Sequence, residues 1–128
     1  MILVLAGSKS DEEIVQKAEE VLKEAGAKYK VEYCSAHREP DRLDGIVKKS
    51  DADIFICIAG LSAALPGVVA SKTKKPVIGV PVSSKLGGMD ALLSIAQMPK
   101  GVPVACVGID NGANAAHLAL RMLDLKKS

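Results

Sequence analysis

The chain has 128 residues, 48% of them hydrophobic, and its 17 basic and 15 acidic side chains leave a formal charge of +2. This balance of charge, together with only three aromatic residues, disfavours a nucleic-acid-binding protein, which needs basic surfaces or aromatic stacking platforms. No apolar run approaches the roughly 20 residues of a membrane span, and the apolar start Met1–Ala6 lacks the basic flank of a signal peptide, so we expect a cytoplasmic protein.

Strand-like and helical patterns alternate along the whole chain. Ile2–Ala6 predicts a buried strand, and the helix predicted at Asp11–Ala25 places its apolar residues on one face before Gly26 stops it: Ile14, Ala18, Val21, Leu22 and Ala25. Further strands, short and rich in β-branched residues, are predicted at Tyr29–Cys34, Asp53–Ala59, Pro76–Val80 and Pro103–Ile109. Further helices are predicted at Pro40–Lys49, Ser62–Lys72, Met89–Gln97 and Asn114–Leu125. This alternation indicates α/β architecture, a doubly wound parallel sheet covered on both faces, in a single three-layer domain over residues 1–128.

The first loop, Gly7-Ser8-Lys9-Ser10-Asp11, joins a predicted strand to a helix at the edge where such sheets bind ligands. Glycine permits the turn, and the helix N-terminus suits a phosphate, to which Ser8 adds a hydroxyl donor. Asp11 either accepts from a sugar hydroxyl or caps the helix, the commoner use of Asp at such a position. The loop matches neither GxxxxGK[ST] nor GxGxxG, so nothing supports ATP or NAD binding.

The second loop carries the sharper signal, His37-Arg38. A guanidinium can hold a phosphate bidentately, and an imidazole moves protons near neutral pH. By contrast, His117 lies on a predicted helix and is interpreted as structural, and Cys34 as a buried thiol at a strand end. The three cysteines are widely spaced without a Cys-x-x-Cys pair, so neither a disulfide framework nor a metal site is expected.

The third loop, Gly60–Gly67, contains no ionisable group. Its small apolar residues suit a flat neutral group or a small gas-like molecule, or they form no more than a tight turn between strand and helix. The fourth loop, Ser83-Ser84-Lys85-Leu86-Gly87-Gly88, is predicted at the same edge of the sheet.

These motifs resemble those of the PurE family of purine biosynthesis. The resemblance follows the chain in order through Gly7-Ser8-x-Ser10-Asp11, Ser35-Ala36-His37-Arg38-x-Pro40, Leu65-Pro66-Gly67, Pro76-Val77-Ile78-Gly79-Val80-Pro81, Gln97-Met98-Pro99-x-Gly101-Val102-Pro103-Val104 and Asn114-Ala115-Ala116. It implies a flavodoxin-like fold and a reaction that forms 4-carboxy-5-aminoimidazole ribonucleotide.

The resemblance also implies roles for particular residues. His37 would be the proton shuttle that releases CO2 from N5-carboxyaminoimidazole ribonucleotide and later removes the proton from C4. Ser8, Asp11 and Arg38 would hold the ribose phosphate, and the third loop would confine the CO2. The other substrate-binding positions implied are Ser35, Gly60, Ser62 and Leu65. No cofactor is implied, because the chemistry needs trapping and proton transfer.

Departures from the family pattern leave alternatives open. The mutase branch carries a longer third loop with a histidine just before Leu-Pro-Gly, whereas Ala64 stands there in this chain. The shorter loop is closer to the branch that carboxylates aminoimidazole ribonucleotide directly with CO2. With Ile109-Asp110-Asn111-Gly112, it also resembles the carboxylase of the nickel-pincer cofactor pathway. A nucleotide-binding scaffold without catalysis is the non-enzyme alternative. We rank the mutase first.

The family resemblance implies a homo-oligomer, and we expect an octamer. We expect this chain to lack the C-terminal helical extension of the family and to assemble through the apolar segments Leu61–Val69 and Leu86–Met98.

Overall fold

The computed structural model describes residues 1–127, which form a five-stranded parallel sheet. The strands are β1 (Ile2–Ala6), β2 (Tyr29–Tyr33), β3 (Ile54–Ala59), β4 (Val77–Pro81) and β5 (Ala105–Cys106), in the order β2-β1-β3-β4-β5. β1 pairs on both sides, so that Val4 lies opposite Val31 of β2 and Ile56 of β3. This strand order, with its switch point between β1 and β3, is that of flavodoxin-like folds.

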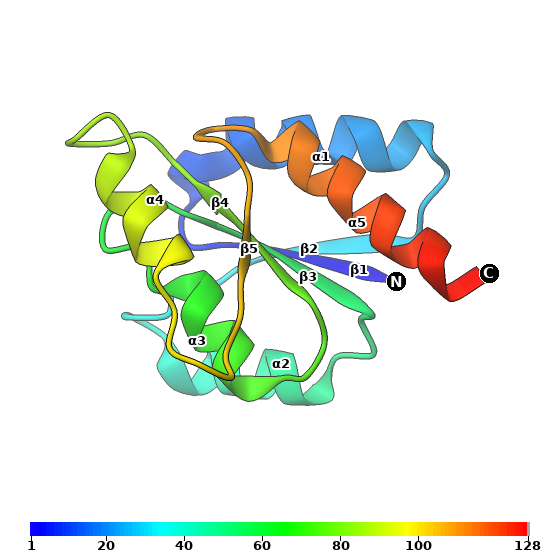
Figure 1. Ribbon diagram of the computed structural model, residues 1–128, viewed down its shortest axis with the longest axis horizontal. Helices are drawn as coiled ribbons and strands as arrows, with labels where there is room; N and C mark the ends of the chain where they lie inside the picture. Colours follow the sequence, from blue (N-terminus) through cyan, green and yellow to red (C-terminus); the bar gives the residue numbers. More distant parts are fainter. Residues whose placement is uncertain (128) are drawn as a thin grey trace.

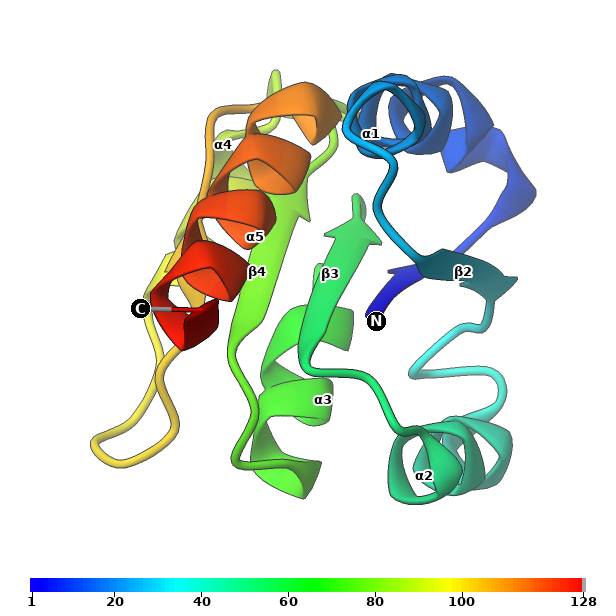
Figure 2. The same cartoon turned by 90° about the vertical axis from the view of Figure 1, so that its right-hand side faces the viewer.

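Helices cover both faces of the sheet (Figures 1 and 2). α1 (Glu12–Glu24), which follows the short 3₁₀ helix η1 (Lys9–Asp11), packs beside α5 (Gly112–Lys127) on one face. The other face is covered by α2 (Pro40–Lys49), α3 (Leu65–Lys72) and α4 (Met89–Ala96). The result is the three-layer α/β domain that the alternating pattern predicts.

Alternate residues of the central strands divide the interior into two aliphatic cores. Ile2 and Val4 of β1 pack with α1 and α5, whereas Leu3 and Leu5 pack with α2, α3 and α4. Every residue of β1, β3 and β4 is buried, as expected for parallel strands covered on both faces. Full burial of one such side chain stabilises the fold by about 1.5–3 kcal/mol, so these strands form a firm base for the loops at their ends.

Two predicted elements are shorter in the structure by three residues or more, and each has a local cause. α3 begins at Leu65 rather than Ser62, because Ser62 has a φ of 50°, a left-handed conformation that a helix does not contain. β5 pairs only at Ala105 and Cys106 instead of over Pro103–Ile109. Pro103 has no N–H to donate, and a turn with Asp110 at a φ of 61° ends the pairing on the other side.

The first helix confirms most of its predicted pattern. Ala18 and Leu22 are buried, but Ala25 is exposed, because the helix ends at Glu24 and the helical period no longer applies. Gly26 ends it with a φ of 67°. None of the helices formed by residues 1–127 combines the length and the apolar character needed to cross a membrane.

Candidate functional site

A cavity of about 570 Å³ lies at the carboxyl ends of the strands. It is lined by the four loops that follow β1, β2, β3 and β4, at the edge where doubly wound sheets bind their ligands. A second cavity, with a larger volume of about 670 Å³, lies between residues 70–77 and 101–103, but no histidine, cysteine or carboxylate lines it. We therefore take the cavity at the carboxyl ends as the candidate site.

The structure brings every predicted site residue to this one cavity. The lining includes Ser8 and Asp11 of the first loop, Ser35, His37 and Arg38 of the second, and Gly60, Ser62 and Leu65 of the third or the start of α3. The sequence places the fourth loop at this edge but names no site residue in it, and the structure adds Val82, Ser83 and Ser84 to the lining. Its position after a buried strand and its two adjacent serines were the signals that could have included it.

Ser8 rather than Asp11 caps the helical turn of the first loop. Its hydroxyl oxygen accepts from the backbone N–H of Ser10 at 3.2 Å and from the Ser10 hydroxyl at 3.0 Å. Asp11 precedes α1 but makes no side-chain capping bond, so capping is the wrong interpretation. Its side chain is buried at the cavity wall, and this burial raises the carboxyl pKa, although a hydrogen bond from the Ser8 backbone lowers it.

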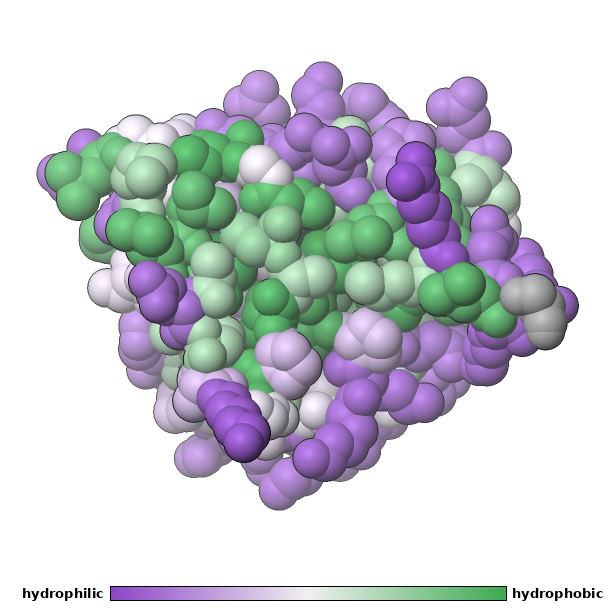
Figure 3. Space-filling model, viewed as in Figure 1, coloured by the Kyte–Doolittle hydropathy of each residue, from purple (hydrophilic) through white to green (hydrophobic). Residues whose placement is uncertain are grey.

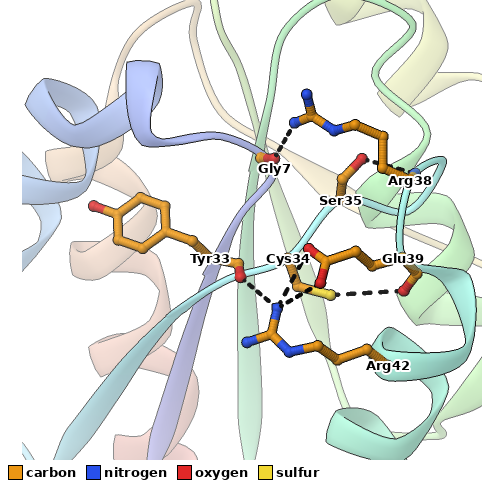
Figure 4. Close-up of polar contacts among 7 residues, drawn as sticks. All are labelled: Gly7, Tyr33, Cys34, Ser35, Arg38, Glu39 and Arg42. Carbon is orange, nitrogen blue, oxygen red and sulfur yellow. Dashed lines mark hydrogen bonds and ion pairs between the residues drawn. The ribbon is translucent and has the colours of Figure 1, made fainter.

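The second loop is folded by hydrogen bonds from its own backbone (Figure 4). The Ser35 hydroxyl accepts from the Arg38 N–H at 3.1 Å, and the Ser35 carbonyl accepts from the Glu39 N–H at 2.9 Å. The turn places His37 at the cavity with its side chain exposed, and within residues 1–127 no hydrogen bond or ion pair restrains that imidazole. His37 is therefore free to meet a ligand.

Arg38 connects the first two loops. One of its guanidinium nitrogens donates to the Gly7 carbonyl at 3.2 Å, as Figure 4 shows. A guanidinium has five N–H donors, so this contact orients the side chain and leaves most of its donors for an anion. Its position beside the capped turn of Ser8 makes this corner of the cavity suitable for a phosphate.

Arg42 links the second loop to the end of β2. Its guanidinium donates to the Tyr33 carbonyl at 2.8 Å and to the Glu39 carboxylate at 3.3 Å (Figure 4). The Cys34 thiol lies beside it, 3.8 Å from the Glu39 carbonyl, and burial raises its pKa. The thiol is thus a buried part of the loop's base, in agreement with its interpretation as structural.

The third loop forms the apolar wall of the cavity, and the fourth loop lies beside it. Ala63 and Leu65 are buried, and the Val82 N–H, just before the fourth loop, donates to the carbonyl of Ala59 at the end of β3 at 3.0 Å. Within residues 1–127, no group of three His, Cys, Asp or Glu side chains is placed to hold a metal ion. The cavity therefore combines one imidazole, one guanidinium and one carboxyl with an apolar wall, a set suited to proton transfer on a bound anion.

The fold and the site define a doubly wound α/β protein with an acid–base group and an anion-binding side chain at its ligand edge. The family model described as AIR carboxylase matches residues 1–128. The chain therefore belongs to the AIR carboxylase family, as its resemblance to PurE proteins predicts.

Relatives agree with this assignment over nearly the whole chain. A protein of Methanocaldococcus jannaschii named N5-carboxyaminoimidazole ribonucleotide mutase is 60% identical over 126 residues, which are 98% of this chain and 80% of that protein. A protein of the same name from Pyrococcus horikoshii is 48% identical, over 98% of this chain and 73% of that protein. The crystal structure of Treponema denticola PurE has a TM-score of 0.86 at 32% identity, and covers 97% of this chain and 80% of that one.

Proposed function

We propose that this protein is an N5-carboxyaminoimidazole ribonucleotide mutase of purine biosynthesis. The observation that carries the proposal is the meeting of His37, Arg38 and Asp11 around one cavity, in a chain 60% identical to a protein of that name. The reaction moves a carboxyl group from the exocyclic nitrogen of the substrate to C4 of its ring, which needs one proton shuttle and a grip on the ribose phosphate.

His37 moves the proton in both halves of the reaction. As an imidazolium, it gives its proton to the carbamate nitrogen while the N–C bond breaks, and the bonding pair stays on nitrogen as CO2 leaves. C4 then attacks the CO2 carbon, and the neutral imidazole removes the proton from C4. The histidine ends as it began, so the isomerisation consumes no proton, which agrees with an exposed and unpaired imidazole at the cavity.

The remaining side chains hold the substrate and the CO2. Arg38 and the Ser8 turn bind the phosphate, and the Asp11 carboxyl accepts a hydrogen bond from a ribose hydroxyl. Ser35, Gly60, Ser62 and Leu65 line the rest of the substrate pocket. The wall from Gly60 to Leu65 has no charged group, so it keeps the CO2 beside the ring without competing for its carbon.

Direct carboxylation of aminoimidazole ribonucleotide is the second candidate. It is favoured by the short third loop, in which Ala64 precedes the buried Leu65 and no histidine side chain is present. Both reactions use the same shuttle and phosphate site, so the geometry of His37 and Arg38 does not separate them.

A side-by-side assay separates the two reactions. We expect the protein to convert N5-carboxyaminoimidazole ribonucleotide without added bicarbonate, and to act far more slowly on aminoimidazole ribonucleotide with CO2. The ultraviolet spectrum of the product follows either reaction. The opposite preference would make the protein a direct carboxylase, and no turnover of either substrate would contradict the proposed function.

We further propose that the protein is a cytoplasmic homo-octamer. Figure 3 shows an apolar area over β5 and the adjoining α4 and α5. Leu61, Leu86, Met89 and Leu93 leave half or more of their surface exposed around α4 and the loops beside the cavity. A continuous apolar area with exposed side chains beside it suits a contact with another copy of the chain. Light scattering tests this, and a monomer with full activity at every concentration would contradict it.

A further inference from the structure

The fourth loop, residues 83–88, lines the cavity with Ser83 and Ser84, but few contacts within the loop hold it in place. It contains two glycines with positive φ, Gly87 at 62° and Gly88 at 90°. Just before it, the Val82 N–H donates to the carbonyl of Ala59 at the end of β3, and the last turn of the loop is closed by a bond from the Met89 N–H to the Leu86 carbonyl at 3.2 Å. The position of Ser83 and Ser84 at the cavity therefore depends on contacts from elsewhere in the chain.

Asp110, which follows β5, supplies the strongest of these contacts. One of its carboxylate oxygens accepts from the Ser83 N–H at 2.8 Å, and the other accepts from the Ser83 hydroxyl at 2.6 Å. The Asp110 N–H itself donates to the Pro81 carbonyl at 2.7 Å. Side chain and backbone of one residue thus fix the point where the chain leaves β4 and enters the loop.

The turn that contains Asp110, residues 108–111, also contacts the other end of the fourth loop. A Cβ built on Gly88 would lie 2.6 Å from Cγ2 of Ile109, so the Ile109 side chain packs directly against the Gly88 backbone. Asn111 closes the turn with a bond to the Gly108 carbonyl at 3.1 Å, and its side chain accepts from the Asn114 N–H at the start of α5 at 2.9 Å. The turn is therefore a rigid support that is anchored to a helix and holds both ends of the loop.

Asp110 adopts an unusual conformation to do this. Its φ of 61° is left-handed, a region that residues with a Cβ avoid, although Asp tolerates it better than most. Glycine would adopt this conformation more easily, but it would lack the carboxylate. The side chain at this left-handed position is the one that binds Ser83, so the backbone conformation and the contact belong to the same residue.

We propose that Asp110 is a positioning residue: its carboxylate sets the fourth-loop wall of the substrate cavity through Ser83. The inference rests on the proposed function for its effect on catalysis, but the ordering of the loop is a property of the chain itself. Asp110 itself does not line the cavity, so it acts through Ser83 and does not contact the substrate.

The test compares Asp110→Gly with Asp110→Ala. Both remove the carboxylate, but glycine relieves the left-handed backbone and alanine does not, so we expect the Ala variant to melt about 3–6 °C below the Gly variant. Despite this difference in stability, kcat/KM should fall by a similar factor in both, about 10- to 100-fold, because hydrogen bonds to a charged group are lost. Asp110→Asn keeps one acceptor oxygen, so its kcat/KM should lie between those of these two variants and that of the wild type.

Hydrogen exchange of the amides of residues 83–88 provides a measurement independent of activity. It should become about 10-fold faster in Asp110→Gly, since the loop loses its main restraint, and should stay unchanged in the control Asp51→Gly, an exposed carboxylate at the other end of the sheet. Ser83→Ala should have little added effect on kcat/KM in the Asp110→Gly background.

These measurements separate the inference from the proposed function. Unchanged loop exchange in Asp110→Gly overturns the inference, whether or not the wild type is active. Activity within a few-fold of the wild type in that variant also overturns it. If the wild type converts neither substrate, the proposed function fails, and faster exchange of the loop in Asp110→Gly alone still supports the positioning role.

Discussion

The two ends of the parallel sheet use their carboxylates in opposite ways. At the amino end, Asp53 accepts from Lys126 at 2.8 Å and from the amino group of Met1 at 2.7 Å, and these hydrogen bonds lower its pKa to about 2. At the carboxyl end, Asp11 has no cationic partner among residues 1–127, and burial raises its pKa. The Asp53 carboxylate joins two distant parts of the chain, whereas the Asp11 carboxyl group remains available to a ligand.

The cations follow the same division. Lys72 and Lys48 both bind Asp44, at 3.0 and 2.9 Å, away from the cavity. At the cavity, Arg38 has one contact with a neutral carbonyl, and His37 has no partner within the described part of the chain. Groups left unpaired at a concave surface gain their interactions when a charged ligand binds, which is how clustered ionisable groups indicate a functional site. The comparison predicts that substitutions at the carboxyl end change activity and that those at the amino end change stability.

The largest effect is expected for His37→Asn. Asparagine keeps the polarity of the side chain but does not carry a proton near neutral pH, so turnover should fall by about 10²–10⁴-fold. Binding of aminoimidazole ribonucleotide and the melting temperature should stay close to those of the wild type, because the imidazole is exposed and unpaired. His117→Asn, an exposed position on α5, is the matched control. Turnover within a few-fold of the wild type would remove His37 from the mechanism.

A smaller effect is expected for Arg38→Ala, which acts through binding. Loss of charge-assisted hydrogen bonds to a phosphate costs about 1.5–3 kcal/mol, so KM should rise by about 10- to 100-fold. Titration of the nucleotide and of its nucleoside with wild type and variant measures this directly, with the exposed Arg121→Ala on α5 as control. Equal weakening of nucleotide and nucleoside would show that Arg38 does not contact the phosphate.

Much of the fold could be predicted because the local sequence patterns of this chain agree with the burial of each element in the tertiary structure. The β-branched segments of β1, β3 and β4 are fully buried, so their composition alone distinguishes them from the amphipathic helices. Doubly wound sheets bind their ligands at the carboxyl ends of the strands, so the predicted site residues could be placed at one edge of the sheet from the sequence alone.

The features that could not be predicted depend on tertiary contacts. Two examples are the left-handed conformation of Ser62, which lies before the start of α3, and the burial of Asp11, whose side chain makes no capping bond to α1. Neither has a local sequence signal. The bond between Ser83 and Asp110 joins residues 27 positions apart, so neither residue identifies the other. Tertiary contacts of this kind are visible only when the sheet has brought the loops together.

The smallest effect is expected at the amino end, for Asp53→Asn. Asp53 joins the start of the chain to the end of α5, but its side chain is 27% exposed, so the loss at pH 7 should be about 1 kcal/mol of unfolding free energy, the upper end for exposed ion pairs. The pKa of Asp53 is lower in the folded than in the unfolded protein, where it is about 3.9, so its contribution is complete above that value. As the pH falls from about 4 toward the folded pKa of about 2, the carboxylate is protonated and the wild type should approach the variant in stability. Urea unfolding at pH 7 and at pH 3 measures this difference, and kcat/KM at pH 7 should not change. A stability gap that persisted unchanged at low pH, or a loss of activity, would show that the amino end does more than close the fold.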